Sequence, residues 1–122
     1  MEKLEFLAIA KAKRENWLTT MTDEERMVMG KHLEYVQRMF SEGNVVLAGP
    51  CLDGAYGIVI YQAESPEAAQ EMFLNDPAVQ SGILDMELHP FKGIGRSVIV
   101  FIKINETNPS QFRNYWERGW FK

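Results

Sequence analysis

The stretch VVLAGPCLDGAYGIVIYQA, residues 45–63, decides the fold. Its two halves, 45–52 and 55–63, are short runs rich in Val, Ile and other apolar residues, which is typical of β-strands. Asp53-Gly54 between them is a strong signal for a two-residue hairpin turn. The stretch therefore predicts two antiparallel strands that follow each other directly, with no helix between them.

A helix is predicted on each side of this hairpin. Thr22-Asp23-Glu24-Glu25 has the pattern of a capping box, in which the Thr hydroxyl and the Glu25 carboxylate each accept a backbone N–H at the helix start. That helix is expected to end at Gly43, since glycine is common just after a helix C-terminus. Ser65-Pro66 predicts the second helix, with Ser as the N-cap and Pro in the first turn. It is expected to end near Asn75.

Further outward lie two more predicted strands, residues 4–12 and 83–91. The order strand–helix–strand–strand–helix–strand predicts an α+β, ferredoxin-like βαββαβ fold with an antiparallel sheet. Gly93-Ile94-Gly95 is a predicted hinge, followed by a fifth strand over 97–104 and a helix that begins near Asn108. We therefore expect a domain over residues 1–92 and a C-terminal extension over 93–122.

The predicted sheet has two apolar faces. Residues 4–12 and 55–63 carry apolar side chains at both alternating sets of positions. Two helices cover one face of a four-stranded sheet, and the other face would be an unusually large exposed apolar patch for a monomer. A symmetric copy would cover it, so we predict a homodimer, or a larger homo-oligomer, that the aromatic side chains of the extension help to hold.

Composition and charge narrow the classes of partner. The chain has 122 residues and a formal net charge of -4, so it repels phosphate backbones and no nucleic-acid partner is expected. Its longest strongly apolar run is far shorter than a membrane span, and no signal-peptide pattern opens it. With one cysteine, Cys51, it cannot form an internal disulfide. These features predict a cytoplasmic protein with no membrane partner.

His32 is the first candidate for chemistry. The predicted core face of its helix carries four apolar side chains: Met29, Leu33, Val36 and Phe40. His32 lies beside this stripe, at the predicted border between core and solvent. An imidazole there suits proton transfer, but a histidine that only hydrogen-bonds a neighbour fits as well. Gly30 nearby leaves room either for a ligand or for close helix packing.

Functional and structural roles are also weighed for three further residues: Asp76, Cys51 and His89. Asp76 precedes Pro77, so it either caps the next helical turn or accepts a hydrogen bond from an imidazole and fixes its tautomer. Cys51 is either a nucleophile paired with His32 or, as we favour, a small buried apolar residue. His89 falls on the polar side of its strand, which favours a surface or interface position.

Cofactor motifs are absent from the sequence. It contains no glycine-rich nucleotide-binding loop, no nucleophile elbow and no cluster with zinc-ligand spacing. We therefore expect no cofactor and no metal. If the protein binds a small-molecule substrate, Trp17, Tyr56 and Phe73 are candidate pocket walls, because they fall near the ends of elements around the expected cleft.

Several short stretches, taken together and in order, are similar to the YciI-like (YCII-related) family over about residues 4–92. They are Met21-Thr22-Asp23-Glu24-Glu25, His32 with Tyr35, EGNVVLAGP at 42–50, Asn75-Asp76-Pro77-Ala78-Val79 with Gly82, and His89-Pro90-Phe91. The pattern does not extend beyond Phe91. Cys51 departs from it, because an aliphatic or aromatic residue is expected there.

The resemblance implies the dimeric α+β barrel fold, in which two ferredoxin-like units pair sheet to sheet. It also implies that His32 and Asp76 match the histidine and aspartate regarded as the active-site pair of the family. One characterised relative is a dehydrochlorinase, and isomerases and cofactor-free monooxygenases share the superfamily. We therefore predict a His–Asp acid–base enzyme of lyase, isomerase or hydrolase type that acts on a small cyclic or aromatic substrate. The alternative is a non-catalytic module for ligand binding or dimerisation.

Overall fold

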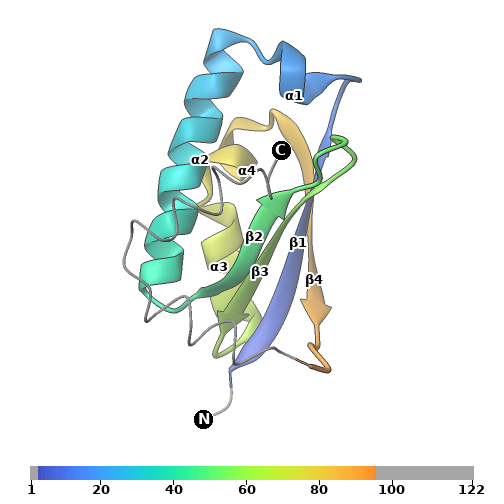
Figure 1. The fold of residues 1–122 in the computed structure, drawn as a ribbon. Helices are drawn as coiled ribbons and strands as arrows, with labels where there is room; N and C mark the ends of the chain where they lie inside the picture. The colour runs from blue at the N-terminus through green and yellow to red at the C-terminus, as the bar shows by residue number, and fades with distance from the viewer. Residues whose placement is uncertain (1–2, 96–122) are drawn as a thin grey trace, which may run out of the picture. The chain divides into compact units, whose positions relative to one another are not determined.

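The computed structural model describes residues 3–95, and the compact unit within them ends at Lys92 (Figure 1). Its elements follow the chain in this order: β1 (Leu4–Ala12), α1 (Trp17–Thr20), α2 (Asp23–Ser41), β2 (Val45–Pro50), β3 (Gly57–Ala63), α3 (Pro66–Leu74), α4 (Pro77–Ser81) and β4 (Leu84–Phe91). The strand predicted over 97–104 and the helix predicted from Asn108 lie outside the described residues.

The four strands form one antiparallel sheet in the order β2-β3-β1-β4. Each of the two central strands, β3 and β1, therefore has two neighbours, and the two strands of the hairpin lie side by side. The helices α2, α3 and α4 lie on one face of this sheet (Figure 1). The predicted ferredoxin-like α+β fold is confirmed.

The core lies between that face and the helices. Its buried side chains alternate along the two central strands, as the period of a strand requires, and repeat every three or four residues along the helices. They include Phe6 and Ala8 from β1, Val59, Tyr61 and Ala63 from β3, Tyr35, Val36 and Met39 from α2, and Ala69 and Phe73 from α3.

The core face of α2 differs from the predicted one. Leu33 and Phe40 are 56% and 44% exposed, whereas Tyr35, Val36 and Met39 are buried. Two apolar stripes run along this helix, and periodicity alone does not show which of them packs against the sheet. The inward stripe is the one that buries the large ring of Tyr35, whose hydroxyl donates to the Met72 carbonyl oxygen at 2.7 Å. His32 lies on this same stripe, one turn before Val36.

The connection between β2 and β3 is longer than a two-residue turn. Pro50 pairs with Gly57, and the Cys51 N–H donates to the Tyr56 carbonyl oxygen at 2.6 Å. A two-residue turn of the expected type needs two residues with positive φ, but only Gly54 adopts one here (φ 80°). The Asp53 carboxylate instead accepts from the Ala55 N–H at 2.9 Å. The two-residue hairpin prediction is therefore wrong.

The longer loop also decides the environment of Cys51. The residue lies just beyond the last pair of the hairpin, where neither sheet nor helix covers it, and it is exposed. The expectation of a small buried apolar residue at this position is therefore wrong.

The outer face of the sheet, opposite the helices, is strongly apolar at its centre. Leu7 and Ile9 of β1 pair with Ile60 and Ile58 of β3, and all four are half-buried. Leu47, paired with Ile60, is exposed. Charged and polar side chains surround this centre; among them are Asp85, Glu87 and His89, which alternate with the core residues along β4.

Candidate functional site

His32 and Asp76, 44 residues apart in the chain, are in direct contact. The Nδ1 atom of His32 lies 2.8 Å from Oδ1 and 2.9 Å from Oδ2 of Asp76. Helix α2 presents His32 from its inward stripe, and Asp76 lies at the junction between α3 and α4. Packing of α2 against α4 brings the two side chains together.

Local chain geometry holds Asp76 in place. Helix α3 ends at Leu74 with Asn75 as its C-cap, and Pro77 occupies the first turn of α4, so Asp76 is the N-cap of α4. Its Oδ1 atom accepts from the Ala78 N–H at 2.9 Å, and its side chain is 0% exposed. Asp76 therefore combines the two roles that the sequence offered as alternatives: it caps a helix and it contacts an imidazole.

The contact defines the hydrogen-bonding roles of the His32 ring. A carboxylate only accepts hydrogen bonds, so the Nδ1 atom facing it carries the proton. When the ring is neutral, its Nε2 atom is therefore unprotonated. Among residues 3–95 this Nε2 atom has no hydrogen-bond partner, and the His32 side chain is 18% exposed. The arrangement can take up a proton at Nε2 while Asp76 stabilises the resulting imidazolium.

Two buried tyrosines lie in the core close to this pair. Burial, together with the negative charge of Asp76, raises the pKa of Tyr61 well above its ordinary value. Burial followed by the charge of Asp76 also raises the pKa of Tyr35. Tyr61 was not a candidate in the sequence. The sequence could have identified it in one way: Tyr61 places a hydroxyl on the core side of a central strand, at a position where Phe would pack as well.

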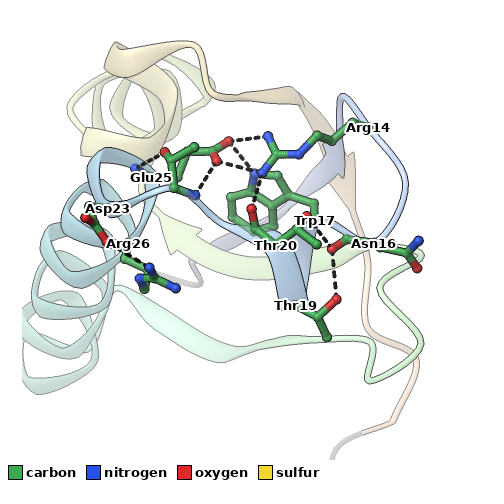
Figure 2. Close-up of polar contacts among 9 residues, drawn as sticks. Arg14, Asn16, Trp17, Thr19, Thr20, Asp23, Glu25 and Arg26 are labelled. Atoms are coloured by element: carbon green, nitrogen blue, oxygen red, sulfur yellow. Dashed lines mark hydrogen bonds and ion pairs between the residues drawn. The ribbon is translucent and has the colours of Figure 1, made fainter.

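Trp17 belongs to a separate cluster at the start of α2 (Figure 2). Its indole N–H donates to the Glu25 carboxylate at 2.7 Å, and Arg14 contacts both oxygens of that carboxylate at 2.8 Å. Glu25 also accepts from the Thr22 N–H at 2.8 Å and so completes the predicted capping box. The Arg14 guanidinium, helped by this backbone bond, holds the pKa of Glu25 well below its ordinary value.

The three candidate pocket residues do not gather around His32. Trp17 lines a hollow of about 580 Å³ beside the β2–β3 loop, and Phe73 lines another of about 340 Å³ between α3 and β4. Neither His32 nor Asp76 lines these two hollows. Tyr56 is exposed, with the Lys11 amino group 5.9 Å from its ring centre. Phe73 does lie beside the pair, since its carbonyl oxygen accepts from the Asp76 N–H at 3.2 Å.

Within residues 3–95, no group of three or more His, Cys, Asp and Glu side chains is placed to hold a metal ion. The helices in this part of the chain are all too short or too polar to cross a membrane.

Comparisons with known proteins give one family and one fold. The profile of the YCII-related domain matches residues 5–92. A search of curated proteins finds no significant match. Among solved structures, the chain is similar to the 5-chloro-2-hydroxyhydroquinone dehydrochlorinase from Burkholderia phenoliruptrix, solved in complex with 2,5-dihydroxybenzoquinone. The TM-score is 0.53 at 20% sequence identity, over 71% of this chain and 93% of that chain.

Proposed function

Because the chain belongs to the family of YCII-related domains, we propose that it is a small-molecule enzyme in which His32 and Asp76 form an acid–base pair. One observation carries the proposal: the Nδ1 atom of His32 lies 2.8 Å from a carboxylate that is wholly buried and held by a helix cap. A buried carboxylate in contact with a partly exposed imidazole suits general-base chemistry, because it orients the ring and stabilises the imidazolium that forms.

The proposed reaction begins with a proton transfer to His32. An acidic O–H or C–H of the substrate gives its proton to Nε2, and the electron pair left behind forms a new π bond. In an elimination, the formation of this bond expels a neighbouring leaving group together with its bonding electron pair. In an isomerisation, an existing double bond shifts along the ring and Nε2 returns the proton to another carbon atom. Asp76 stabilises the imidazolium until the proton leaves. Such catalysis accelerates reactions by roughly 10²–10⁴-fold.

The proposed substrate is a small hydroxylated ring. The structural relative is a dehydrochlorinase bound to 2,5-dihydroxybenzoquinone, which supports a planar ligand with acidic hydroxyl groups for this fold. In a dehydrochlorination the proton passes to the base and chloride departs with the bonding electrons, so an imidazole base and a buried carboxylate partner suffice on the protein side.

We also propose that the protein is a homodimer joined through the outer face of the sheet. This face carries an apolar centre of Leu7, Ile9, Ile58 and Ile60, with Leu47 exposed beside them. The helices cover the opposite face, so a second copy is the simplest cover for this one.

The function is tested with the compounds of the structural relative. We expect 5-chloro-2-hydroxyhydroquinone to lose chloride in the presence of the protein, and His32→Gln to lower the rate by about 10²–10⁴-fold. Binding of 2,5-dihydroxybenzoquinone, measured by calorimetry, should change little in this variant, because the glutamine side chain is polar and similar in size to the imidazole. Glu34→Gln, a variant on the exposed side of the same helix, should leave the rate unchanged.

The same experiment separates catalysis from mere ligand binding. If the rate and its pH dependence are the same in His32→Gln as in the native protein, the acid–base role is refuted. A protein that binds 2,5-dihydroxybenzoquinone without turnover, and whose affinity survives Asp76→Asn, is a binding module instead. The separation of the two hollows from His32 is the observation that favours this second candidate.

A further inference from the structure

Tyr35 is a buried side chain whose hydroxyl the proposed mechanism leaves unused. It follows His32 by three residues on α2, so the two side chains are neighbours on the inward side of the helix. The Tyr35 hydroxyl donates to the Met72 carbonyl oxygen of α3 at 2.7 Å. Two side chains of α2, one turn apart, therefore reach the segment that runs from the end of α3 to the start of α4.

The Met72 carbonyl oxygen needs this donor because the chain leaves the helix just after it. A carbonyl inside an α-helix accepts from the N–H four residues later, which for Met72 belongs to Asp76. Asp76 has an extended backbone (φ -68°, ψ 126°), and its N–H donates to the Phe73 carbonyl oxygen at 3.2 Å instead. The Tyr35 hydroxyl therefore replaces the backbone donor that Met72 loses where the chain forms the Asp76 cap.

The two contacts of α2 hold one short segment at both of its ends. Tyr35 bonds to Met72, and His32 meets the Asp76 carboxylate four residues later at 2.8 Å. The bond from the Asp76 N–H to Phe73 keeps the segment between them compact, so a shift of Met72 relative to α2 also moves Asp76. Hydrogen bonds weaken quickly beyond about 3.2 Å, so a small shift is enough to loosen the contact with His32.

The Tyr35 side chain is itself fixed and stays a donor. The Arg38 guanidinium lies over its ring, 5.3 Å from the ring centre, within the range of a cation–π contact. Burial, followed by the charge of Asp76, raises the pKa of Tyr35, so the hydroxyl keeps its proton at neutral pH. This hydroxyl therefore acts by donating one hydrogen bond and not by transferring a proton.

We propose that Tyr35 is a positioning residue of the His32–Asp76 pair: its hydroxyl, bonded to the Met72 carbonyl oxygen, fixes the end of α3 against α2 and so holds the Asp76 carboxylate at hydrogen-bond distance from Nδ1 of His32. The consequence for catalysis rests on the proposed function. The effect on the contact between His32 and Asp76 does not.

The test reads the tautomer of His32 from the ¹⁵N NMR shifts of its ring, at a pH at which the ring is neutral. In the native protein we expect the proton on Nδ1, facing Asp76. Tyr35→Phe keeps the aromatic ring and removes the donor, so the contact should loosen and a measurable share of the proton should move to Nε2. His89, the other histidine of the chain, should keep its shifts and serves as the internal control.

Val36→Ala is the matched structural control. Val36 is buried beside Tyr35 on the same helix, and its truncation removes packing without removing a hydrogen bond. We expect the His32 shifts of this variant to match those of the native protein. Unchanged shifts in Tyr35→Phe overturn the proposal. Equal changes in Tyr35→Phe and Val36→Ala also overturn it, because a general loosening of the core would then explain them.

A double-mutant cycle in urea gives a second readout. In the His32→Ala background, Tyr35→Phe should raise the equilibrium constant for unfolding roughly fivefold, the usual effect of losing one hydrogen bond. In the native background the increase should be roughly 10- to 20-fold, because the bond between His32 and Asp76 weakens as well. Equal effects in the two backgrounds overturn the proposal. Neither measurement uses a substrate, so a failure of the chloride-release assay would leave both results standing.

Discussion

Asp76 accepts hydrogen bonds from two sides with a single carboxylate. From the backbone it accepts from the Ala78 N–H, and from α2 it meets the His32 ring, both through Oδ1 within 2.9 Å. A wholly buried carboxylate is costly unless such donors surround it. The helix cap therefore supplies part of the stabilisation that makes a buried acid next to His32 possible.

These two roles of Asp76 respond differently to substitution. We expect Asp76→Ala to lower the free energy of unfolding by about 3 kcal/mol, because the cap and the bond to His32 are lost together. Asp76→Asn should cost about 1 kcal/mol or less, since Asn caps helices as well as Asp does. Urea denaturation measures both values. Equal losses in the two variants would contradict a capping role for Asp76.

At the scale of elements, the start of α2 shows how a short local pattern recruits distant partners. The Thr22–Glu25 capping box follows directly from the sequence, and the structure adds Arg14 and Trp17 as further donors to Glu25 (Figure 2). These bonds tie the segment after β1 to the first turn of α2.

The Glu25 cluster predicts how stability depends on pH. The pKa of Glu25 is held below its ordinary value of 4.5, chiefly by Arg14. As the pH falls, the Glu25 carboxylate is therefore protonated in the unfolded chain before it is protonated in the folded protein. The contribution of ionised Glu25 to the free energy of unfolding is therefore complete above pH 4.5 and is lost progressively below that pH. In Glu25→Gln the decline of stability below that pH should be shallower, while Gln keeps the capping box.

Urea denaturation at a series of pH values, compared between the two proteins, measures this slope. Glu24→Gln is the control, since it removes the same charge from the first turn and leaves the contacts of Glu25 in place. If Glu24→Gln and Glu25→Gln flatten the curve equally, the effect comes from net charge and not from the cluster.

For the whole molecule, the decisive feature is a sheet with two apolar faces and helices on one of them. The pairing of Leu7 with Ile60 and of Ile9 with Ile58 places four aliphatic side chains at the centre of the outer face. If this apolar face is exposed to solvent in a monomer, it favours association with another protein molecule. The role of the 93–122 extension in holding a dimer stays a prediction.

The proposed dimer is tested by a charge placed on this face. We expect the native protein to sediment with the mass of a dimer and Ile60→Glu with the mass of a monomer, because a buried unpaired carboxylate cannot be accommodated between two sheets. Leu33→Glu, on the exposed side of α2, should keep the mass of the native protein. A monomeric native protein, or a dimeric Ile60→Glu variant, would refute this interface.

Short-range features were predictable to a large extent. Strand alternation, the capping box, Ser65-Pro66 and Asp76-Pro77 all act within a few residues, and the structure shows each of them. The position of Gly54 in a turn was also predictable, but the length of its loop was not. That length depends on the register of β2 against β3, which is set across the sheet and includes a shift between Val45 and Leu47.

The sequence by itself determined the order of the four strands and of α2 and α3, the starts of these helices, the family and the two residues, His32 and Asp76, that the family pattern marks; the short helix α1 was not predicted. The tertiary structure decided which stripe of α2 turns inward, and with it the exposure of Leu33 and the contact between His32 and Asp76. It also decided that the Tyr61 hydroxyl lies buried without a hydrogen-bond partner among residues 3–95. The reason is physical: capping and alternation depend on neighbours in the chain, whereas the rotation of a helix with two apolar stripes depends on the sheet and helices that pack against it.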